Sequence, residues 1–148
     1  MSVDTVVRPV APADAARWRT LFADYGVFYE TAFTDEVLDR VWEQLLAEGS
    51  GIDGLVAVRD GAIVGIAHYR SHPDTFSGGR DWFLDDLFVD PEVRGTGAGR
   101  ALIAHLAQLA AGTGGSLRWI TADTNATAQA LYDKVATRTR WVTYEIRG

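Results

Sequence analysis

The sequence predicts a single α/β domain over residues 1–148, built on a mixed but mostly antiparallel sheet with helices on both faces. Three observations support this prediction. Apolar residues recur at helical spacing in some segments and at every second position in others. These segments follow one another in the order βααβββαβαβ, and neither a repeat nor a linker divides the chain. With 47% hydrophobic residues, the chain has enough apolar material for one core.

The first third of the chain is predicted to form one strand and two helices. Residues 3–10 are a short strand candidate that ends before Pro12. Residues 12–30 carry their large apolar side chains on one helical face. Thr34, followed by two acidic residues, has the features of a helix N-cap, and the helix it begins ends at Gly49.

The centre of the chain changes to a period of two. Residues 55–70 form two strand-like runs joined by Asp60-Gly61, a dipeptide typical of tight hairpins. A further strand is expected over 80–90, after a turn. The remaining expected elements are a helix after the glycine-rich stretch, a strand over 116–122, a helix over 125–136 and a closing strand over 138–146.

Composition excludes several classes of function. The chain has no cysteine, which rules out disulfides, thiolate metal sites and a cysteine nucleophile, and its three histidines lack metal-ligand spacing. The net charge of −6 disfavours non-specific nucleic-acid binding. No apolar run approaches the roughly 20 residues of a membrane helix, and the first residues lack the order of a signal peptide. We therefore expect a cytoplasmic protein with no metal and no nucleic-acid or membrane partner.

Three alternating glycines, Gly95, Gly97 and Gly99, stand between a strand-like run and a helix-like run. A P-loop would need Lys and Ser/Thr after the last glycine, where Arg100 and Ala101 stand. A dinucleotide-binding fingerprint would need glycine at position 100 and would follow the first strand. A plain strand-to-helix turn is the usual explanation of an isolated Gly-x-Gly, but the flanking residues favour a phosphate site.

Two arginines and a helix start surround these glycines. Arg94 precedes them, Arg100 follows them, and the helix expected to begin near Gly97 directs its free N–H groups at the loop. This combination suits a pyrophosphate, because glycines let the phosphate approach the backbone. The motif Arg-x-x-Gly-x-Gly after Leu-Phe-Val-x-Pro resembles the acetyl-CoA loop of the Gcn5-related N-acetyltransferases, the GNAT superfamily.

A second motif strengthens the resemblance. Residues 125–136 are similar to the family's Asn-x-x-Ala-x-x-Leu-Tyr-x-Lys motif, although Ala136-Thr137 stands where the family often has Gly-Phe. The resemblance implies a GNAT-like N-acetyltransferase domain over 1–148, with acetyl-CoA as co-substrate. The implied cofactor-binding residues are Leu87, Phe88, Val89, Arg94, Gly95, Thr96, Gly97, Ala98, Gly99, Arg100, Asn125, Tyr132 and Lys134.

The chemistry of acetyl transfer assigns roles to some of these residues. A backbone N–H of Phe88 or Val89 would stabilise the oxyanion, as the resemblance implies. Tyr132, near the thioester sulfur, would protonate the departing thiolate. Direct attack in a ternary complex is favoured, because no cysteine can carry a covalent acetyl group.

The proton acceptor is predicted from an acidic pair in the strand. Asp85 and Asp86 should point to opposite faces by two-residue alternation. The resemblance to polyamine-acetylating members implies that Asp85 accepts the amine's proton through a water molecule, while Asp86 braces the strand. His68 is the alternative base, whereas His72 and His105 look like surface residues.

The acceptor is expected to be a primary amine. The chain resembles the subgroup of fungal histone/polyamine and D-amino-acid acetyltransferases, whose substrates include polyamines, amino acids and basic peptides. Expected substrate-binding residues are Tyr25, Tyr29, Glu30, Asp81 and Asp85. The alternative is a non-catalytic module that binds acetyl-CoA or CoA as a regulatory ligand. The resemblance also implies a homodimer, and the aromatic strand over 141–144, which would otherwise leave an exposed edge, supports this expectation.

Overall fold

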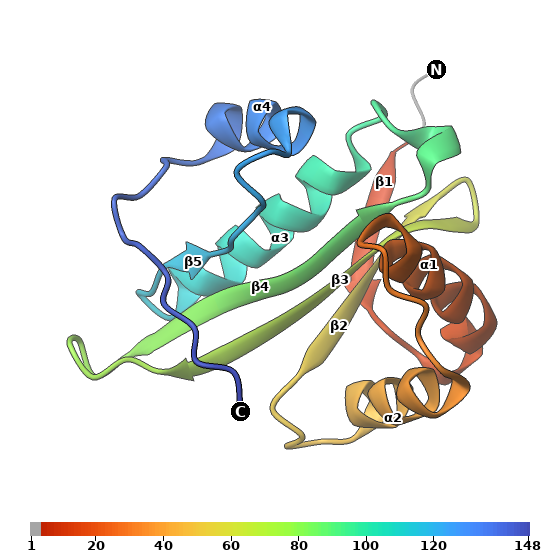
Figure 1. Cartoon of the computed structure of the whole chain (residues 1–148), viewed down its shortest axis with the longest axis horizontal. Helices are drawn as coiled ribbons and strands as arrows, with labels where there is room; N and C mark the ends of the chain where they lie inside the picture. The colour runs from red at the N-terminus through yellow and green to blue at the C-terminus, as the bar shows by residue number, and fades with distance from the viewer. Residues whose placement is uncertain (1–3) are drawn as a thin grey trace.

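A five-stranded sheet organises the computed structural model, which describes residues 4–148 (Figure 1). The strands lie side by side in chain order, from β1 to β5. β1 to β4 are antiparallel to one another in succession, and β5 runs parallel to β4, which confirms the predicted mixed sheet. The predicted first strand begins at Val3, which lies outside the described residues. The strands are β1 (Thr5–Pro9), β2 (Asp53–Arg59), β3 (Ala62–Pro73), β4 (Arg80–Val89) and β5 (Leu117–Arg118).

Helices cover both faces of the sheet, as predicted (Figure 1). α1 (Ala15–Phe28), which follows the short 3-10 turn η1 (Pro12–Asp14), and α2 (Asp35–Leu46) pack on one face. α3 (Ala98–Gly112) packs on the other face, and α4 (Ala126–Val135) adds partly buried side chains to the same cluster. A second 3-10 turn, η2 (Pro91–Val93), leads from β4 into the glycine loop. No helix within residues 4–148 is long and apolar enough to cross a lipid bilayer.

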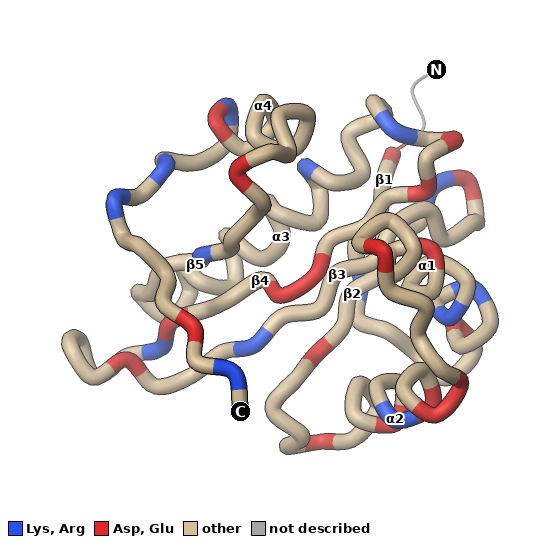
Figure 2. The backbone as a smooth tube through the Cα atoms, viewed as in Figure 1, with Lys and Arg blue, Asp and Glu red and all other residues tan. Residues whose placement is uncertain are grey.

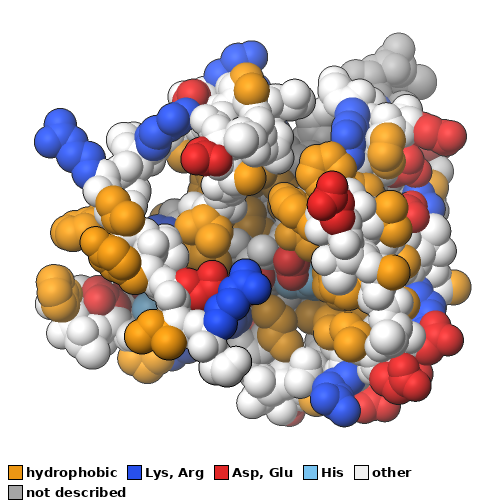
Figure 3. Space-filling view, in the orientation of Figure 1, with side chains coloured by type: hydrophobic (Ala, Val, Ile, Leu, Met, Phe, Trp, Pro, Cys, Tyr) orange, Lys and Arg blue, Asp and Glu red, His pale blue; other side chains and the backbone are white. Residues whose placement is uncertain are grey.

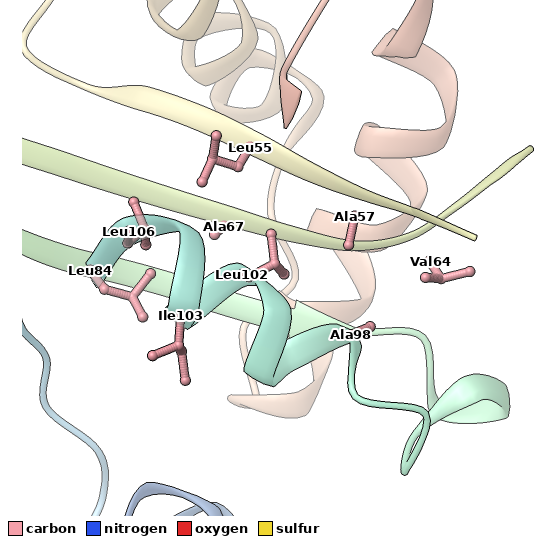
Figure 4. Packing of buried hydrophobic residues seen from close by; sticks show 9 residues of the cluster. All are labelled: Leu55, Ala57, Val64, Ala67, Leu84, Ala98, Leu102, Ile103 and Leu106. Carbon is pink, nitrogen blue, oxygen red and sulfur yellow. The ribbon is translucent and has the colours of Figure 1, made fainter. Parts of the chain in front are cut away.

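Two hydrophobic clusters, one on each face of the sheet, hold the layers together. In β2, Leu55 belongs to the cluster under α3, whereas the next residue, Val56, belongs to the cluster under α1 and α2. Figure 4 shows the first cluster, in which Leu102 and Leu106 of α3 lie against strand residues. Because neighbouring strand residues point to opposite faces, burial on both sides explains why β2 is almost continuously apolar.

Local sequence features fix the turns that were predicted. The Thr34 hydroxyl oxygen accepts a hydrogen bond from the Val37 N–H at 3.2 Å, which caps α2. Asp60 and Gly61 have positive φ angles of 50° and 76°, as a two-residue hairpin turn between β2 and β3 requires. The predicted hairpin and the predicted start of α2 are therefore confirmed.

A β-bulge in β4 overturns the predicted orientation of the acidic pair. His68 of β3 pairs with Asp86 and Tyr69 pairs with Leu84, so Asp85 is an extra residue without a partner in the register. The Asp85 carboxylate contacts Arg70, and the Asp86 carboxylate contacts His68. Because His68 and Arg70 are two residues apart on β3, both carboxylates lie on the same face, and the prediction of opposite faces was wrong.

The C-terminal part forms less sheet than predicted. β5 is two residues long, although a strand was expected over 116–122. No strand forms over 138–146, so the predicted closing strand is wrong for the structure of one chain. Ladder hydrogen bonds require a neighbouring strand, and the segment runs exposed from α4 to the C-terminus (Figure 1). Its large apolar side chains, Trp141, Val142, Tyr144 and Ile146, are exposed to solvent.

Candidate functional site

A cavity with a volume of about 680 Å³ lies at the end of β4. Its walls come from the C-terminal end of α1, the end of β4, the glycine loop, the first turn of α3, and α4. Figure 3 shows the hollowed face of the molecule, with hydrophobic and acidic side chains around the opening. The lining residues are Tyr25, Phe28, Tyr29, Leu87, Phe88, Val89, Arg94, Gly95, Gly97, Ala98, Gly99, Arg100, Asn125, Thr127, Ala128, Ala130, Leu131, Tyr132 and Lys134.

The glycine loop lines one end of this cavity with bare backbone. Gly95 and Gly97 have φ angles of 85° and 89°, a conformation that residues with a side chain adopt only with strain. Nothing lies within 4 Å of the position that a Cβ of Gly97 would occupy, so this residue faces open space. Gly97 is the N-cap of α3, whose first N–H groups have no partner within the helix. This end of the cavity can therefore bind an anion.

Three cationic side chains surround the same end. Arg94, Arg100 and Lys134 line the cavity, although the chain as a whole carries a net charge of −6. The Arg94 guanidinium lies 5.6 Å from the ring centroid of Phe88 and 6.0 Å from that of Phe28. Its Nε donates a hydrogen bond to the carbonyl oxygen of Val89 at 3.4 Å. Positive charge is thus concentrated where the glycine loop exposes its backbone.

Along the cavity, the edge of β4 opposite α4 is not paired with another strand. β5 pairs with β4 only at Trp82 and Phe83, so the later residues of β4 have no neighbour on that side. The Asp90 N–H donates to the Val64 carbonyl on the β3 side. Backbone groups alternate between the two edges of a strand, so the N–H groups of Leu87 and Val89 point at the free edge. Of the two predicted oxyanion donors, Val89 is the one directed into the cavity.

Tyr132 stands where the cavity meets a smaller recess. The recess, of about 30 Å³, shares Tyr25, Tyr29, Leu87 and Tyr132 with the main cavity. The Tyr132 ring meets Trp119 edge-on, with 5.3 Å between centroids. Burial raises the pKa of the Tyr132 hydroxyl above its usual value. The hydroxyl therefore keeps its proton at neutral pH and can donate it.

Asp85 is on the wall of the recess and forms an ion pair with Arg70. The guanidinium contacts both carboxylate oxygens, at 2.7 and 2.8 Å. This fork-shaped contact fixes the orientation of the carboxylate. Since each carboxylate oxygen has two lone pairs, Asp85 can still accept a hydrogen bond from a water molecule.

Asp86 is connected to a buried chain of polar groups. Its Oδ2 is 3.0 Å from Nδ1 of His68, and Nε2 of His68 accepts a hydrogen bond from the Trp18 indole N–H at 2.9 Å. Burial first, and then the nearby Asp86 carboxylate, raise the pKa of Tyr25 far above its usual value. His68 is 2% exposed and lines neither the cavity nor the recess.

Some predicted site residues lie elsewhere. Asp81 binds Arg118 at 2.9 Å and the Ser116 N–H at 3.0 Å, and these contacts join β4 to β5 rather than face the cavity. Glu30 is exposed and lines neither hollow. The Thr96 hydroxyl donates to the Val93 carbonyl, and Thr96 lines neither hollow. Asn125 lines the cavity and caps α4 by accepting from the Ala128 N–H.

Sequence reasoning missed three contributors to the site. Phe28 supports Arg94, Arg70 pairs with Asp85, and Trp119 supports Tyr132. The helical aromatic face of residues 12–30 included Phe28, but nothing in the pattern indicated that it reaches the glycine loop. His72 bonds the Pro73 carbonyl, and His105 lies on α3. Within residues 4–148, no group of three acidic or histidine side chains could hold a metal ion.

Comparisons with known proteins all identify acetyltransferases as similar to this chain. The family model described as the acetyltransferase (GNAT) family matches residues 18–136. The chain is 30% identical over 146 residues to the D-amino-acid N-acetyltransferase HPA3 of Saccharomyces cerevisiae, covering 97% of this chain and 91% of that protein. It is 35% identical over 101 residues to the aminoglycoside N(6')-acetyltransferase type 1 of Stenotrophomonas maltophilia, covering 66% of this chain and 62% of that protein.

A solved structure extends the comparison to the fold. The aminoglycoside N-acetyltransferase AAC(6')-Iy, solved in complex with CoA, superposes with a TM-score of 0.78 at 21% sequence identity. The match covers 99% of this chain and 97% of that chain. At this identity, the similarity shows a shared fold.

Proposed function

The chain belongs to the acetyltransferase (GNAT) family, and we propose that it transfers the acetyl group of acetyl-CoA to a primary amine by direct attack in a ternary complex. Its relatives are named as N-acetyltransferases, which supports an enzyme of this class. The observation that carries the proposal is the shape of the cavity. An anion-binding end, with bare glycine backbone and three cations, is joined to an end with Tyr132, a free strand edge and a carboxylate.

The cofactor half of the proposal concerns the loop and the free edge. The pyrophosphate would accept hydrogen bonds from the loop between Gly95 and Gly99, with Arg94, Arg100 and Lys134 supplying positive charge. The pantetheine arm would follow the free edge of β4, with Asn125 on the opposite wall. The residues present fit this ligand, because a Cβ at Gly97 would point into space that is otherwise empty.

The chemical step follows from the other end of the cavity. The amine nitrogen attacks the thioester carbon, and the developing oxyanion accepts a hydrogen bond from the Val89 N–H. As the C–S bond breaks, the thiolate takes the proton of the Tyr132 hydroxyl. The proton lost by the amine passes through a water molecule to Asp85, whose carboxylate Arg70 holds in place.

The acceptor would enter through the recess between α1 and β4. Tyr25, Tyr29 and Asp85 line it, which suits a cationic amine. D-amino acids and aminoglycosides appear in the names of relatives, and both are amines, as are the polyamines and basic peptides expected from the sequence. We propose an acceptor from this chemical class.

A thiol-release assay with acetyl-CoA tests the proposed function. The panel should contain polyamines, D- and L-amino acids, an aminoglycoside and a basic peptide, with the matched alcohols as controls. We expect thiol release that depends on at least one amine. Binding of acetyl-CoA without thiol release for any amine would instead favour the non-catalytic module.

We also propose that the chain forms a homodimer through residues 138–146. Trp141, Val142, Tyr144 and Ile146 are exposed on a segment that has no strand partner within residues 4–148. Sedimentation should show a dimer that is lost when the chain is truncated after Thr137. A monomer at micromolar concentration for the full chain would contradict this. The cytoplasmic location and the absence of a nucleic-acid partner stay predictions.

A further inference from the structure

The glycine loop needs contacts from its surroundings to keep one shape. Gly95 and Gly97 have positive φ angles, and apart from their chain neighbours no atom of residues 4–148 lies within 4 Å of the positions that their Cβ atoms would take. Glycine has more conformational freedom than any other residue, so such a loop is ordered only where neighbouring contacts restrain it. A loop that is already ordered binds its ligand more tightly, because less entropy is lost on binding. The restraint comes through residues 90–94, the lead-in segment between β4 and the loop.

A series of short hydrogen bonds runs along the lead-in segment, whose acidic and basic residues follow β4 in Figure 2. The Asp90 N–H donates to the Val64 carbonyl at 2.8 Å, and one Asp90 carboxylate oxygen accepts from the Glu92 N–H at 3.0 Å. The Val93 N–H donates to the Asp90 carbonyl at 3.0 Å, and the Val93 carbonyl accepts from the Thr96 hydroxyl at 2.6 Å. Asp90 is therefore the first residue of a chain of contacts that reaches the glycine loop.

Arg17 of α1 fixes the Asp90 side chain. Its Nη2 donates to the second carboxylate oxygen of Asp90 at 2.7 Å, and its Nε donates to the Ile63 carbonyl of β3 at 3.0 Å. Because the guanidinium is planar, these two contacts together fix its orientation. Hydrogen bonds from the Glu92 N–H, and then from Arg17, hold the pKa of Asp90 below its usual value, so it is ionised at neutral pH. The ion pair thus joins α1, β3 and the lead-in segment at one point.

Arg17 and Asp90 line neither the cavity nor the recess. Their side chains are 39% and 21% exposed, and ion pairs that are open to solvent contribute little to stability. The place of this pair gives it a different effect, because it connects a packed helix to the start of a glycine-rich loop. It restricts the directions that the loop can take.

Helix α1 contacts the lead-in segment at its other end as well. The Arg94 guanidinium lies 6.0 Å from the ring centroid of Phe28, the last residue of α1. The contact from the opposite side is longer, since Nη1 of Arg59 in β2 is 3.4 Å from the Thr96 carbonyl oxygen. The shortest contact to the lead-in segment from a distant element is therefore the ion pair between Arg17 and Asp90.

We propose that Arg17 and Asp90 are positioning residues of the cofactor site, and that their ion pair holds the glycine loop in the conformation that binds the pyrophosphate. The inference rests on the proposed function, in which this loop binds the pyrophosphate of acetyl-CoA. Since neither residue lines the cavity, the pair acts through the loop.

Titration calorimetry with acetyl-CoA tests both partners of the pair. Arg17→Gln removes the guanidinium, and Asp90→Ser removes the carboxylate but keeps an oxygen that can accept from the Glu92 N–H. We expect each variant to raise the Kd roughly 5- to 20-fold, which is less than the roughly 10- to 100-fold effect of losing one hydrogen bond to a charged group. The two substitutions combined should bind no more weakly than the weaker single variant, because the residues act as one unit. Effects that multiply in the double variant would overturn the proposal.

Arg8→Gln is the matched control. Arg8 forms an ion pair with Asp14 at the other 3-10 turn, η1, and its side chain is 41% exposed. Neither residue lines the cavity. Urea unfolding should show a similar loss of stability in Arg8→Gln and Arg17→Gln, and only Arg17→Gln should bind acetyl-CoA more weakly. An equal loss of affinity in Arg8→Gln would mean that affinity follows overall stability, and would overturn the proposal.

The protein without ligand provides an independent measurement. The heteronuclear NOE of a backbone amide reports its order on the picosecond-to-nanosecond timescale. The NOE values of Gly95 and Gly97 should fall in Arg17→Gln and in Asp90→Ser, whereas that of Gly61, which has a φ angle of 76° in the turn between β2 and β3, should not change. Unchanged values for the loop glycines would overturn the proposal. Each single variant tests the pair by itself, so one folded variant is sufficient.

The outcomes separate this inference from the proposed function. The parental Kd in both single variants would overturn the inference and leave the acetyltransferase reaction untouched. Weaker binding in the variants, together with no thiol release by the parent for any amine, would support the inference and reject the proposed reaction. A parent chain that does not bind acetyl-CoA would refute both.

Discussion

Replacing Gly97 by alanine separates the effect of this glycine on folding from its effect on cofactor binding. The φ angle of Gly97 is 89°, and a side chain in this left-handed region costs about 1–2 kcal/mol in folding. For a chain of this size, that corresponds to a fall in Tm of roughly 2–8 °C. The added Cβ meets no protein atom within 4 Å, so no steric clash in the free protein adds to this cost.

Cofactor binding should suffer more than folding does. The Cβ would project into the space proposed for the pyrophosphate and would hold it away from the backbone N–H groups. A hydrogen bond to a charged group contributes about 1.5–3 kcal/mol, so we expect the Kd for acetyl-CoA to rise roughly 10- to 100-fold per bond lost. Titration calorimetry with acetyl-CoA measures this change directly.

Gly49→Ala is the matched control for this experiment. Gly49 has a φ angle of 75° and equally open surroundings, but it lies after α2 and does not line the cavity. The two variants should lose similar stability, and only Gly97→Ala should lose affinity. Equal acetyl-CoA affinities in both variants would refute the placement of the phosphates on this loop.

Four further predictions concern three individual side chains. Tyr132→Phe should lower kcat by roughly 10²- to 10⁴-fold with little change in acetyl-CoA affinity, because it removes a proton donor and keeps the ring on Trp119; a normal kcat would reduce Tyr132 to a packing residue. In the parent enzyme, burial raises the pKa of Tyr132, so its acid function should persist up to at least about pH 10 in a kcat–pH profile. Asp85→Asn should lower kcat/KM most near neutral pH, and the defect should shrink as rising pH deprotonates the free amine; a defect that is constant with pH would mean that Asp85 does not accept the proton. Hydrogen bonds from Arg8 hold the pKa of Asp14 below its usual value. The Asp14 carboxylate therefore stabilises the fold fully at a pH above its unfolded pKa of about 3.9. This contribution to the free energy of unfolding disappears as the pH falls through the lower pKa of the folded state. Urea unfolding of Asp14→Asn against the parent should therefore show a difference at pH 7 that vanishes in strong acid, and a difference that stays constant would contradict the ion-pair explanation.

The parts of the fold that depend on local signals could be predicted from the sequence. The Thr34 cap, the Asp60-Gly61 turn and the helix after the glycines each rest on contacts within a few residues. The glycine loop, Asn125 and Tyr132 were found because their motifs combine local conformation with chemistry, and the structure brings all three to one cavity.

The features that depend on distant partners could not be predicted. The alternation rule assumes a regular ladder, and the bulge at Asp85 is defined only by the register against β3. The partners Arg70 and Arg118, which distinguish Asp85 from Asp81, lie on other strands. Residues 138–146 have strong strand propensity, but a strand also needs a neighbour, and the described part of the chain supplies none.

Transfer of a labelled acetyl group tests the proposed reaction most directly. The full chain is incubated with acetyl-CoA labelled in the acetyl group, with and without the most active amine, and protein and products are analysed by mass spectrometry. We predict that the label appears as an amide on the amine, in equal amount to the thiol released, and never on the protein. Label on the protein before the amine is added would contradict direct attack. Bound acetyl-CoA with no labelled amide for any amine would contradict the acetyltransferase itself.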